Sequence, residues 1–518
     1  MAAFKRQYFF GIFIVISVLM ITLFASELTR VEAAKPGDVV IATSSAVFNC
    51  KGGDPATQTG APPYVSRTVF DSLISVTTDR KPSPALAKSY KIAAGWKYID
   101  FFLRDDVKFQ NGETVTAEDV KYTLGKYLER KYRFVFRPMW RRIIKEVEIV
   151  NPTQVRVHLK EADWGFVGRL WWSGGIMPKA YRERVGDKGF SNKPIGAGPF
   201  KWVDYKQDQW FKVEAVKNHY RMTPKVKSLK VIYVPEHSTR LAMLKAGEVD
   251  IAPLLGAHVG SIKSDPKFKI HWTKFVSGST IVFADLVAPD TPSPFHDIRV
   301  RKAVNLAIDR KIICKKILFG ASEPWGDILA SITLGYDPSL KPEPYDPERA
   351  KALLAEARYP NGFKTTINVQ TTSITADALA ASLSEIGIRV KVDKYESGAF
   401  YERFFTRKFR GLIPYVGWYD VEYNAPSELS DFYLRKAVHT YYRSDEVDTM
   451  LRKSMYSETE EELAVWVRKL SKAIRESLIT VFLWANHTPY GLGPRIKYWE
   501  PTIGSIPSIG FETIELNP

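Results

Sequence analysis

Cysteine is scarce in this chain of 518 residues. Only Cys50 and Cys314 occur, far apart in the sequence, and no Cys-x-x-Cys motif is present. The usual signature of a thiol redox centre or a cysteine metal site is therefore missing. Whether the two residues form a disulfide is left open by the sequence, and a buried free thiol is favoured at Cys314.

Catalytic motifs are also missing. The eight histidines include no His-Glu-x-x-His pair or other close ligand spacing, and we find no phosphate loop, no Gly-x-Ser-x-Gly elbow and no dinucleotide fingerprint. We therefore expect no metal, no cofactor and no enzymatic activity. Paired carboxylates can lie far apart in a sequence, so an exported hydrolase stays as an alternative.

Dense blocks of one charge are absent as well. The 74 basic and 57 acidic residues give a net charge of +17, but the two signs alternate along the chain. No helix-turn-helix or RNA-binding aromatic signature accompanies them, which argues against nucleic acid as a partner. A generally basic, solvated surface is the expected reading.

The N-terminus has the features of an export signal. Lys5 and Arg6 precede an uncharged run from Tyr8 to Ser26, and the small residues Ala33 and Ala34 follow as candidate cleavage positions. The run is also close to the ~20 residues that span a bilayer, so an uncleaved membrane anchor is the alternative. Both readings place the remainder outside the cytoplasm, and no cysteine follows the run where a lipid anchor would need one.

Length and patterning predict an α/β protein of two or three domains. Strand, helix and strand patterns follow each other in two units, at 228–234, 237–246 and 249–251, and again at 366–370, 375–385 and 388–392. No repeats or low-complexity tracts are evident.

The segment PFHDIRVRKAVNLAIDRK, residues 294–311, predicts an amphipathic helix. Asp297 is placed as its N-cap. The apolar face contains Val300, Ala303, Val304, Ala307 and Ile308, and the charged surface is expected to contain Arg299, Arg301, Lys302, Asp309, Arg310 and Lys311.

This segment resembles a helix of the extracytoplasmic binding proteins of peptide-type (dipeptide and oligopeptide) ABC transporters, the bacterial extracellular solute-binding proteins of family 5. Further similar segments follow the family's order, at Phe101–Leu124, Gly196–Tyr205 and Tyr345–Phe363. In the last of these, Arg358 stands where the family commonly has glycine, which is expected to alter the end of the preceding helix.

The resemblance implies a three-domain, two-lobed cleft fold of the periplasmic-binding-protein-like type (class II). The signal peptide is expected at 1–34. Domain I is expected to be discontinuous, at 35–70, 193–284 and 486–518. Domain II is expected at 71–192 and domain III at 285–485. Two crossings between the lobes, near Phe283–Ala288 and Trp484–His487, would form a hinge that allows closure around a ligand.

The segment GWYDVEYNAP, residues 417–426, is the best candidate for ligand recognition. The family has a similar passage whose tryptophan contacts the ligand and whose acid pairs with a peptide's terminal ammonium. Trp418 matches the tryptophan, whereas Glu422 and Asp420 compete for the acidic position. Further candidate ligand contacts are Tyr419, Tyr423, Asn424, Thr59, Gly60 and Ala61.

The expected function is that of a periplasmic receptor, a monomer that closes around a peptide or peptide-like solute. It would deliver this solute to the transmembrane subunits of an ABC permease with a separate cytoplasmic ATPase. An oligosaccharide, an opine or another non-peptide solute is the alternative ligand, because the fold does not fix ligand class. An exported hydrolase and a receptor for unfolded chains are two further alternatives to this function.

Overall fold

The computed structural model describes residues 35–44, 50–58, 64–77, 81–132, 134, 136–273, 277–331, 333–417, 426–434, 437, 440–501 and 510–518. The expected signal segment, 1–34, lies outside these ranges. Within them, no helix has both the length and the apolar character needed to cross a membrane.

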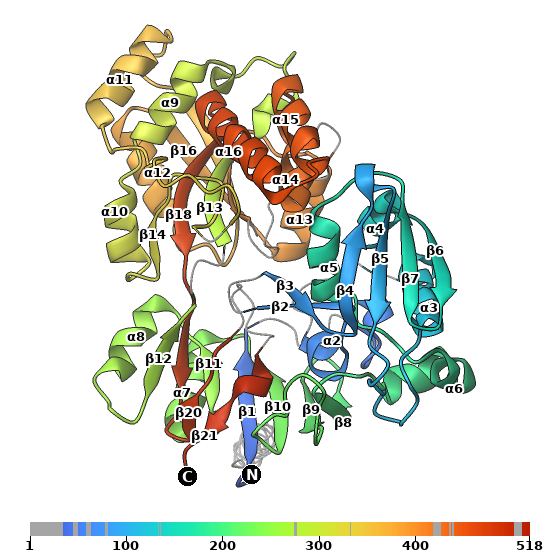
Figure 1. The fold of residues 1–518 in the computed structure, drawn as a ribbon. Helices are drawn as coiled ribbons and strands as arrows, with labels where there is room; N and C mark the ends of the chain where they lie inside the picture. Colours follow the sequence, from blue (N-terminus) through green and yellow to red (C-terminus); the bar gives the residue numbers. More distant parts are fainter. Residues whose placement is uncertain are drawn as a thin grey trace, which may run out of the picture.

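A seven-stranded mixed sheet forms the base of the molecule (Figure 1). Its central strand, β1, pairs in parallel with β10 and β11, which confirms the first strand, helix and strand unit. Gly247 ends α7 with a φ of 74°, a left-handed conformation that suits glycine. In spatial order the strands are β12 (Lys269–Trp272), β19 (Pro489–Leu492), β11 (Ile251–Pro253), β1 (Asp38–Thr43), β10 (Ser228–Tyr233), β9 (Trp210–Ala215) and β8 (Phe200–Lys206). The associated helices are α2 (Tyr64–Val69), α7 (His237–Ala246) and α8 (Gly256–Lys263).

A four-stranded antiparallel sheet lies beside this base. The spatial order is β4 (Ala87–Ile92), β5 (Tyr98–Leu103), β7 (Gln154–Leu159) and β6 (Ile144–Asn151). Around it lie α3 (Ala117–Leu128), α4 (Arg137–Ile143), α5 (Gly165–Ser173), α6 (Lys179–Asn192) and the small β2 (Ile74–Val76) and β3 (Pro82–Pro84) pair.

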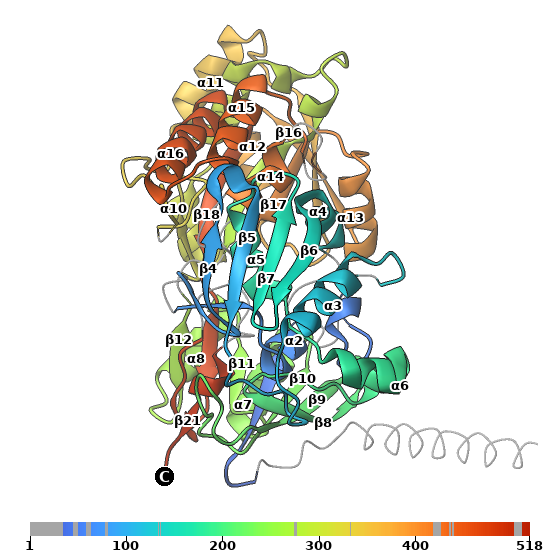
Figure 2. The same ribbon diagram turned by 45° about the vertical axis from the view of Figure 1, so that its right-hand side comes forward.

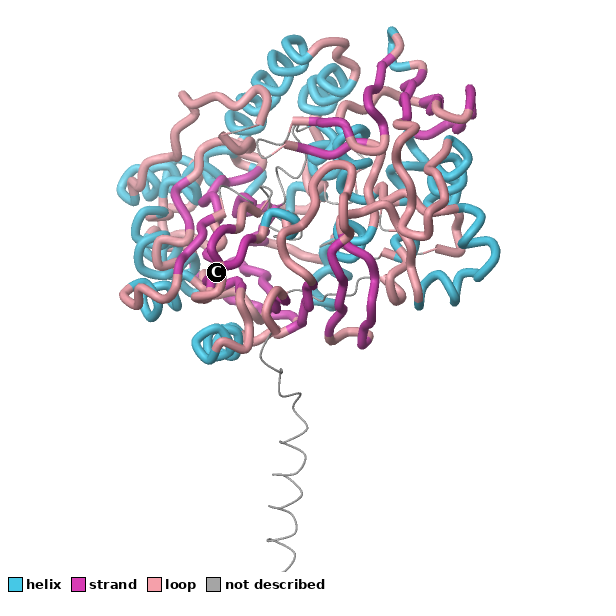
Figure 3. Tube along the Cα trace, turned by 60° about the horizontal axis from the view of Figure 1, so that its bottom comes forward, coloured by secondary structure: helices cyan, strands magenta, loops and turns pink. Residues whose placement is uncertain are grey.

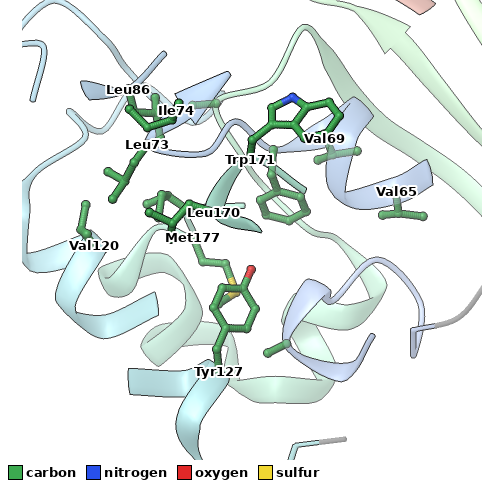
Figure 4. Packing of buried hydrophobic residues seen from close by; sticks show 14 of the residues in the cluster. Val65, Val69, Leu73, Ile74, Leu86, Val120, Tyr127, Leu170, Trp171 and Met177 are labelled. Atoms are coloured by element: carbon green, nitrogen blue, oxygen red, sulfur yellow. The ribbon is translucent and has the colours of Figure 1, made fainter. Parts of the chain in front are cut away.

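One continuous hydrophobic core joins these two sheets into a single lower lobe. It includes Val39 and Leu229 from the base and Ile99 and Val155 from the side sheet. Figure 4 shows the part of this core where Val65, Leu73, Val120, Tyr127, Trp171 and Met177 gather. Trp140 and Trp171 are fully buried in this core.

The upper lobe contains a six-stranded mixed sheet with helices around it (Figures 1 and 2). In spatial order the strands are β14 (Ser322–Pro324), β18 (Thr480–Asn486), β13 (Ser277–Phe283), β17 (Leu412–Gly417), β15 (Lys364–Gln370) and β16 (Arg389–Tyr395). Its helices are α9 (Ile298–Leu306), α10 (Arg310–Ile312), α11 (Pro347–Glu356), α12 (Ala376–Glu385), α13 (Ser397–Phe405), α14 (Pro426–Tyr433), α15 (Asp445–Met455) and α16 (Glu460–Ser477). Figure 3 shows helices on the left and right flanks, with strands between them and also at the upper right edge.

The chain passes between the two sheets twice. The second passage, between β18 and β19 at residues 487–488, lies where the sequence places it. The first lies earlier than the expected 283–288, because β13 already pairs with β17 and β18 of the upper sheet from Ser277 onward. The apolar strand at 277–283 therefore belongs to the upper lobe and not to the base.

Helix α9 begins at the predicted cap, but two arginines predicted on the charged surface of this segment are buried. The Asp297 carboxylate accepts a hydrogen bond from the N–H of Arg299, and Val300 is fully buried. Arg301 and Arg310, however, are buried rather than on the surface. The Arg301 guanidinium donates to the carbonyls of Phe295, His296 and Ser477, and that of Arg310 donates to those of Asn305, Ile308 and Phe482. Backbone acceptors thus replace solvent for both cations.

The two cysteines are free and buried in different lobes, Cys50 in the lower core and Cys314 in the upper one. Burial raises the pKa of the Cys314 thiol to about 12, and it raises that of Cys50 as well, with the nearby Asp54 adding to the effect. Both thiols are therefore protonated and unreactive near neutral pH.

Candidate functional site: a pocket at the strand ends of the upper sheet

A pocket of about 260 Å³ lies at one edge of the upper sheet. The carboxyl ends of β15, β17 and β18 meet the amino end of β13 at this edge, because β13 runs antiparallel to both of its neighbours. The lining residues are Ser279, Thr280, Leu318, Val369, Gln370, Thr372, Ser373, Ile374, Thr375, Phe400, Tyr401, Pro414, Tyr415, Val416, Leu483, Trp484 and Asn486. Ligand sites of open α/β folds commonly lie at such strand ends.

Hydrogen bonds fix part of the polar lining. The Asn486 amide nitrogen donates to the Ser279 hydroxyl at 3.1 Å and to the Ser277 hydroxyl at 3.2 Å, and its oxygen accepts from Ser322 at 3.1 Å. The Gln370 amide reaches the Tyr401 hydroxyl at 3.5 Å. The described lining therefore offers hydroxyl and amide groups beside aromatic rings, and none of these described residues carries a formal charge.

Aromatic packing supports the outer wall of the pocket. The rings of Tyr415 and Phe404 stack with centroids 4.8 Å apart, and Tyr415 also contacts Phe432 at 5.7 Å. On the opposite side Trp325 packs over Gly278, where no side chain intervenes. These contacts hold the ends of β13 and β17 in fixed positions.

The lobes approach each other in two described places. Beside the crossings, the amino end of α8 lies against the turn after residue 317, where an added Cβ at Gly256 would stand 2.5 Å from the carbonyl oxygen of Leu318. On the far side, Trp96 and Trp164 of the lower lobe donate their indole N–H groups to the Ser457 carbonyl. The described parts of the two lobes therefore contact each other both beside the crossings and on the far side.

Every candidate site residue chosen from the sequence lies outside the described residues. This holds for Trp418, Tyr419, Asp420, Glu422, Tyr423 and Asn424, and also for Thr59, Gly60 and Ala61. The described part of β17 ends at Gly417, directly before Trp418 in sequence, and two residues of this strand, Tyr415 and Val416, line the pocket.

Sequence reasoning missed the polar residues that three strands, β13, β15 and β18, and the helix α13 bring together. Ser279, Gln370 and Asn486 are far apart in the chain, so their proximity depends on the pairing of the sheet, and Tyr401 is brought to them by α13. A local signal did exist, because Ser279 and Asn486 stand at the polar ends of otherwise apolar strands.

A buried ion pair of the lower lobe, between Asp71 and Arg221, lies outside the lining of this pocket. Asp71 accepts hydrogen bonds from the Tyr220 hydroxyl at 2.6 Å and from the Arg221 guanidinium at 2.6 Å. Burial alone would raise the pKa of the Asp71 carboxyl, but Arg221 and His219 outweigh it and hold the pKa well below its usual range. Among the described residues, no three His, Cys, Asp or Glu side chains gather as metal ligands would.

Two lobes joined by two crossings, with a pocket at the strand ends, define a solute-binding protein of the periplasmic-binding-protein type. A family profile described as bacterial extracellular solute-binding proteins, family 5 Middle, matches residues 81–438. The chain belongs to this family of binding proteins of ABC transporters.

Curated relatives agree with this assignment. Heme-binding protein A of Haemophilus influenzae is 29% identical over 371 residues, which cover 65% of this chain and 66% of that protein. The glutathione-binding protein GsiB of Salmonella paratyphi A is 28% identical over 382 residues, covering 72% of each chain.

Solved structures show the same fold. The periplasmic binding protein DppA of Helicobacter pylori, in complex with the peptide STSA, has a TM-score of 0.77 and 23% identity, covering 94% of this chain and 99% of that one. The binding protein AgaA of A. tumefacien R10, in complex with agropinic acid, has a TM-score of 0.76 and 22% identity, covering 93% and 99%. The predicted α/β two-lobed fold is thus confirmed.

Proposed function

We propose that this protein is a periplasmic receptor that binds a peptide or peptide-like solute between its lobes and delivers it to the transmembrane subunits of an ABC permease. The observation that carries this proposal is the pocket at the strand ends of the upper sheet, which is the edge where the chain crosses to the lower lobe. Its hydroxyl, amide and aromatic groups suit a solute that offers both amides and apolar surface.

Ligand recognition is assigned to the segment that follows β17. Tyr415 and Val416 line the pocket, and Trp418 comes two positions later in the chain. In this proposal Trp418 stacks on the solute and Glu422 or Asp420 pairs with its ammonium, with further contacts from Tyr419, Tyr423, Asn424, Thr59, Gly60 and Ala61. A closed cleft strengthens such a charge pair because water is excluded.

The receptor works as a monomer without a cofactor and without catalysis, and the ATPase is a separate cytoplasmic subunit. Export through the segment 1–34, with cleavage near Ala33 or Ala34, places the mature protein in the periplasm. The family relationship supports a binding role, and the pocket's described hydroxyl and amide side chains suit binding without requiring chemistry.

A non-peptide solute is the second candidate. AgaA shares this fold and was solved with agropinic acid, and the described lining residues carry no charge that demands a peptide terminus. An opine or an oligosaccharide would use the same aromatic and hydroxyl groups.

The test begins with native mass spectrometry of the exported mature protein, followed by denaturation and identification of the released molecule. A peptide supports the proposal, an opine or a sugar replaces it with the second candidate, and product formation by the purified protein would show an enzyme. An empty protein is screened with peptides by thermal shift, and failure of all peptides refutes the peptide assignment.

The proposed anchor has its own test. Glu422→Gln should weaken the binding of a peptide with a free amine by about 2–5 kcal/mol and leave the binding of its N-acetylated form unchanged. The matched control is Glu461→Gln, an exposed residue in the first turn of α16. Equal binding of both peptide forms by the unaltered protein would remove the ammonium role.

A further inference from the structure

The lobes are joined on the side away from the crossings by hydrogen bonds that converge on one atom. The indole N–H of Trp96 and that of Trp164 both donate to the backbone carbonyl oxygen of Ser457, at 3.0 and 2.6 Å. Ser457 is fully buried in the turn between α15 and α16. A third hydrogen bond runs from the N–H of Gly95 to the carboxylate of Glu458 at 3.2 Å.

Figures 1 and 2 both place the turn between β4 and β5 beside the ends of α15 and α16. Trp164 packs against hydrophobic clusters of both lobes. Both indole donors belong to the lower lobe, and the Ser457 carbonyl that accepts from them belongs to the upper lobe. Separation of the lobes therefore breaks both hydrogen bonds together.

The backbone around Trp96 is held in an unfavourable conformation. Gly95 and Trp96 have φ values of 63° and 54°, and this left-handed conformation is unfavourable for a residue other than glycine. Trp96 nevertheless is only 3% exposed, and its ring meets that of Trp164 edge-on with centroids 5.2 Å apart. Such strain persists where surrounding contacts over-determine it, and these contacts include the opposite lobe.

The second donor is positioned by a buried acid. Asp163 is fully buried, pairs with Arg142 at 3.1 Å and accepts from the N–H of Gly165 at 2.9 Å. This arrangement fixes the turn that carries Trp164 before α5 begins. The lower lobe therefore presents two preorganised donors to the carbonyl.

We propose that Trp96, Trp164 and the Ser457 carbonyl form a latch that holds the lobes closed before any solute binds. A latch that raises the closed fraction lowers the apparent dissociation constant in proportion and slows solute release. This consequence for affinity rests on the proposed receptor function, whereas the latch itself does not.

The test uses the full mature chain freed of bound solute by unfolding and refolding. Spin labels are placed on Lys201→Cys in the lower lobe and Lys351→Cys in the upper lobe, whose side chains are 53% and 46% exposed. The native cysteines are buried and stay unlabelled. Double electron–electron resonance then gives the ratio of closed to open molecules.

Trp96→Phe and Trp164→Phe each keep a ring and remove one N–H. Each should lower the closed-to-open ratio about fivefold, which corresponds to one hydrogen bond of about 1 kcal/mol, and the double variant should lower it further. Trp210→Phe is the matched control, because Trp210 lies in β9, where its ring receives Lys230 of the same lobe.

An identical distance distribution in the unaltered protein and the double variant overturns the latch, and so does a solute-free protein that is entirely open. If the Trp96 variant does not fold, Glu458→Ala removes the third bond from an exposed position and should lower the ratio about twofold. The distance measurement tests the latch, and peptide binding tests the proposed function. If the variants shift the ratio as expected but the protein binds no peptide, the peptide assignment is refuted and the latch is supported.

Discussion

Gly278 is expected to tolerate no larger residue, and its replacement by alanine gives a sharp test of the pocket's architecture. It lies at the beginning of β13, next to the pocket residue Ser279. A Cβ at this position would stand 1.9 Å from Cζ3 and 2.3 Å from Cη2 of Trp325. Carbon atoms in contact are ordinarily about 3.5–4.0 Å apart, so the indole would have to move by roughly 1.5 Å or more.

That movement has a cost that can be assembled from the contacts of Trp325. Its indole N–H donates to the Leu329 carbonyl at 3.2 Å, and its ring meets Phe482 edge-on at 5.3 Å. Losing the hydrogen bond costs about 1 kcal/mol, losing the ring contact about 0.5–1.5 kcal/mol, and overpacking adds about 1–3 kcal/mol. Together these costs are expected to lower the free energy of unfolding of Gly278→Ala by about 2.5–5.5 kcal/mol.

Urea unfolding followed by circular dichroism measures this change, with Gly125→Ala as the control. Gly125 lies inside α3 with no atom within 4 Å of an added Cβ, so the same substitution should there stabilise the protein by about 0.5–1 kcal/mol. The reasoning is refuted if Gly278→Ala is neutral, or if both variants change stability in the same direction. Gly278→Ala should also weaken solute binding, because Ser279 and Asn486 share the displaced strand end.

Two further predictions concern the stability of the fold outside the pocket. Arg358 is exposed and has a φ of 70°, so Arg358→Gly should raise the free energy of unfolding by about 1 kcal/mol in urea titration; a loss of stability would show that the Arg358 side chain outweighs the strain. Asp71 has a folded pKa below its unfolded value, so it stabilises the fold above about pH 4 and loses this effect as the pH falls through the folded pKa. Asp71→Asn should therefore be destabilised strongly near pH 7, with a smaller difference from the unaltered protein at pH 3; a difference independent of pH would contradict the linkage.

Elements with strong local signals were predicted well from the sequence. Asp297 caps α9 by accepting a hydrogen bond from the N–H of Arg299, as its position before the apolar face indicates. Arg358, where an altered helix end is expected, has a φ of 70°, the left-handed conformation that glycine favours at the end of a helix. In each case the residues that decide the structure are within a few positions of each other, so that local chemistry is sufficient.

The errors arise where distant segments decide the outcome. Arg301 and Arg310 look like solvated charges by helical spacing, yet carbonyls from residues as distant as Ser477 and Phe482 receive their guanidinium groups. Likewise the crossing expected near 283–288 would leave β13 in the lower lobe, but β13 pairs with β17 and β18 of the upper sheet. Helical or strand periodicity predicts which face of an element is apolar. It does not predict which carbonyls or strands from distant parts of the chain will contact that element.

The choice between Asp420 and Glu422 shows the same limit at the site itself. Side chains alternate along a strand with a period of two, and Tyr415 is buried while Val416 is exposed. An extended continuation of β17 would place residues 420 and 422 on the same side, because they are two positions apart. Periodicity cannot separate the two acids, and only the backbone path after Gly417 can do so. Comparing Asp420→Asn with Glu422→Gln against the same free and N-acetylated peptide therefore assigns the anchor, since only the acid that contacts the ammonium should distinguish the two ligands.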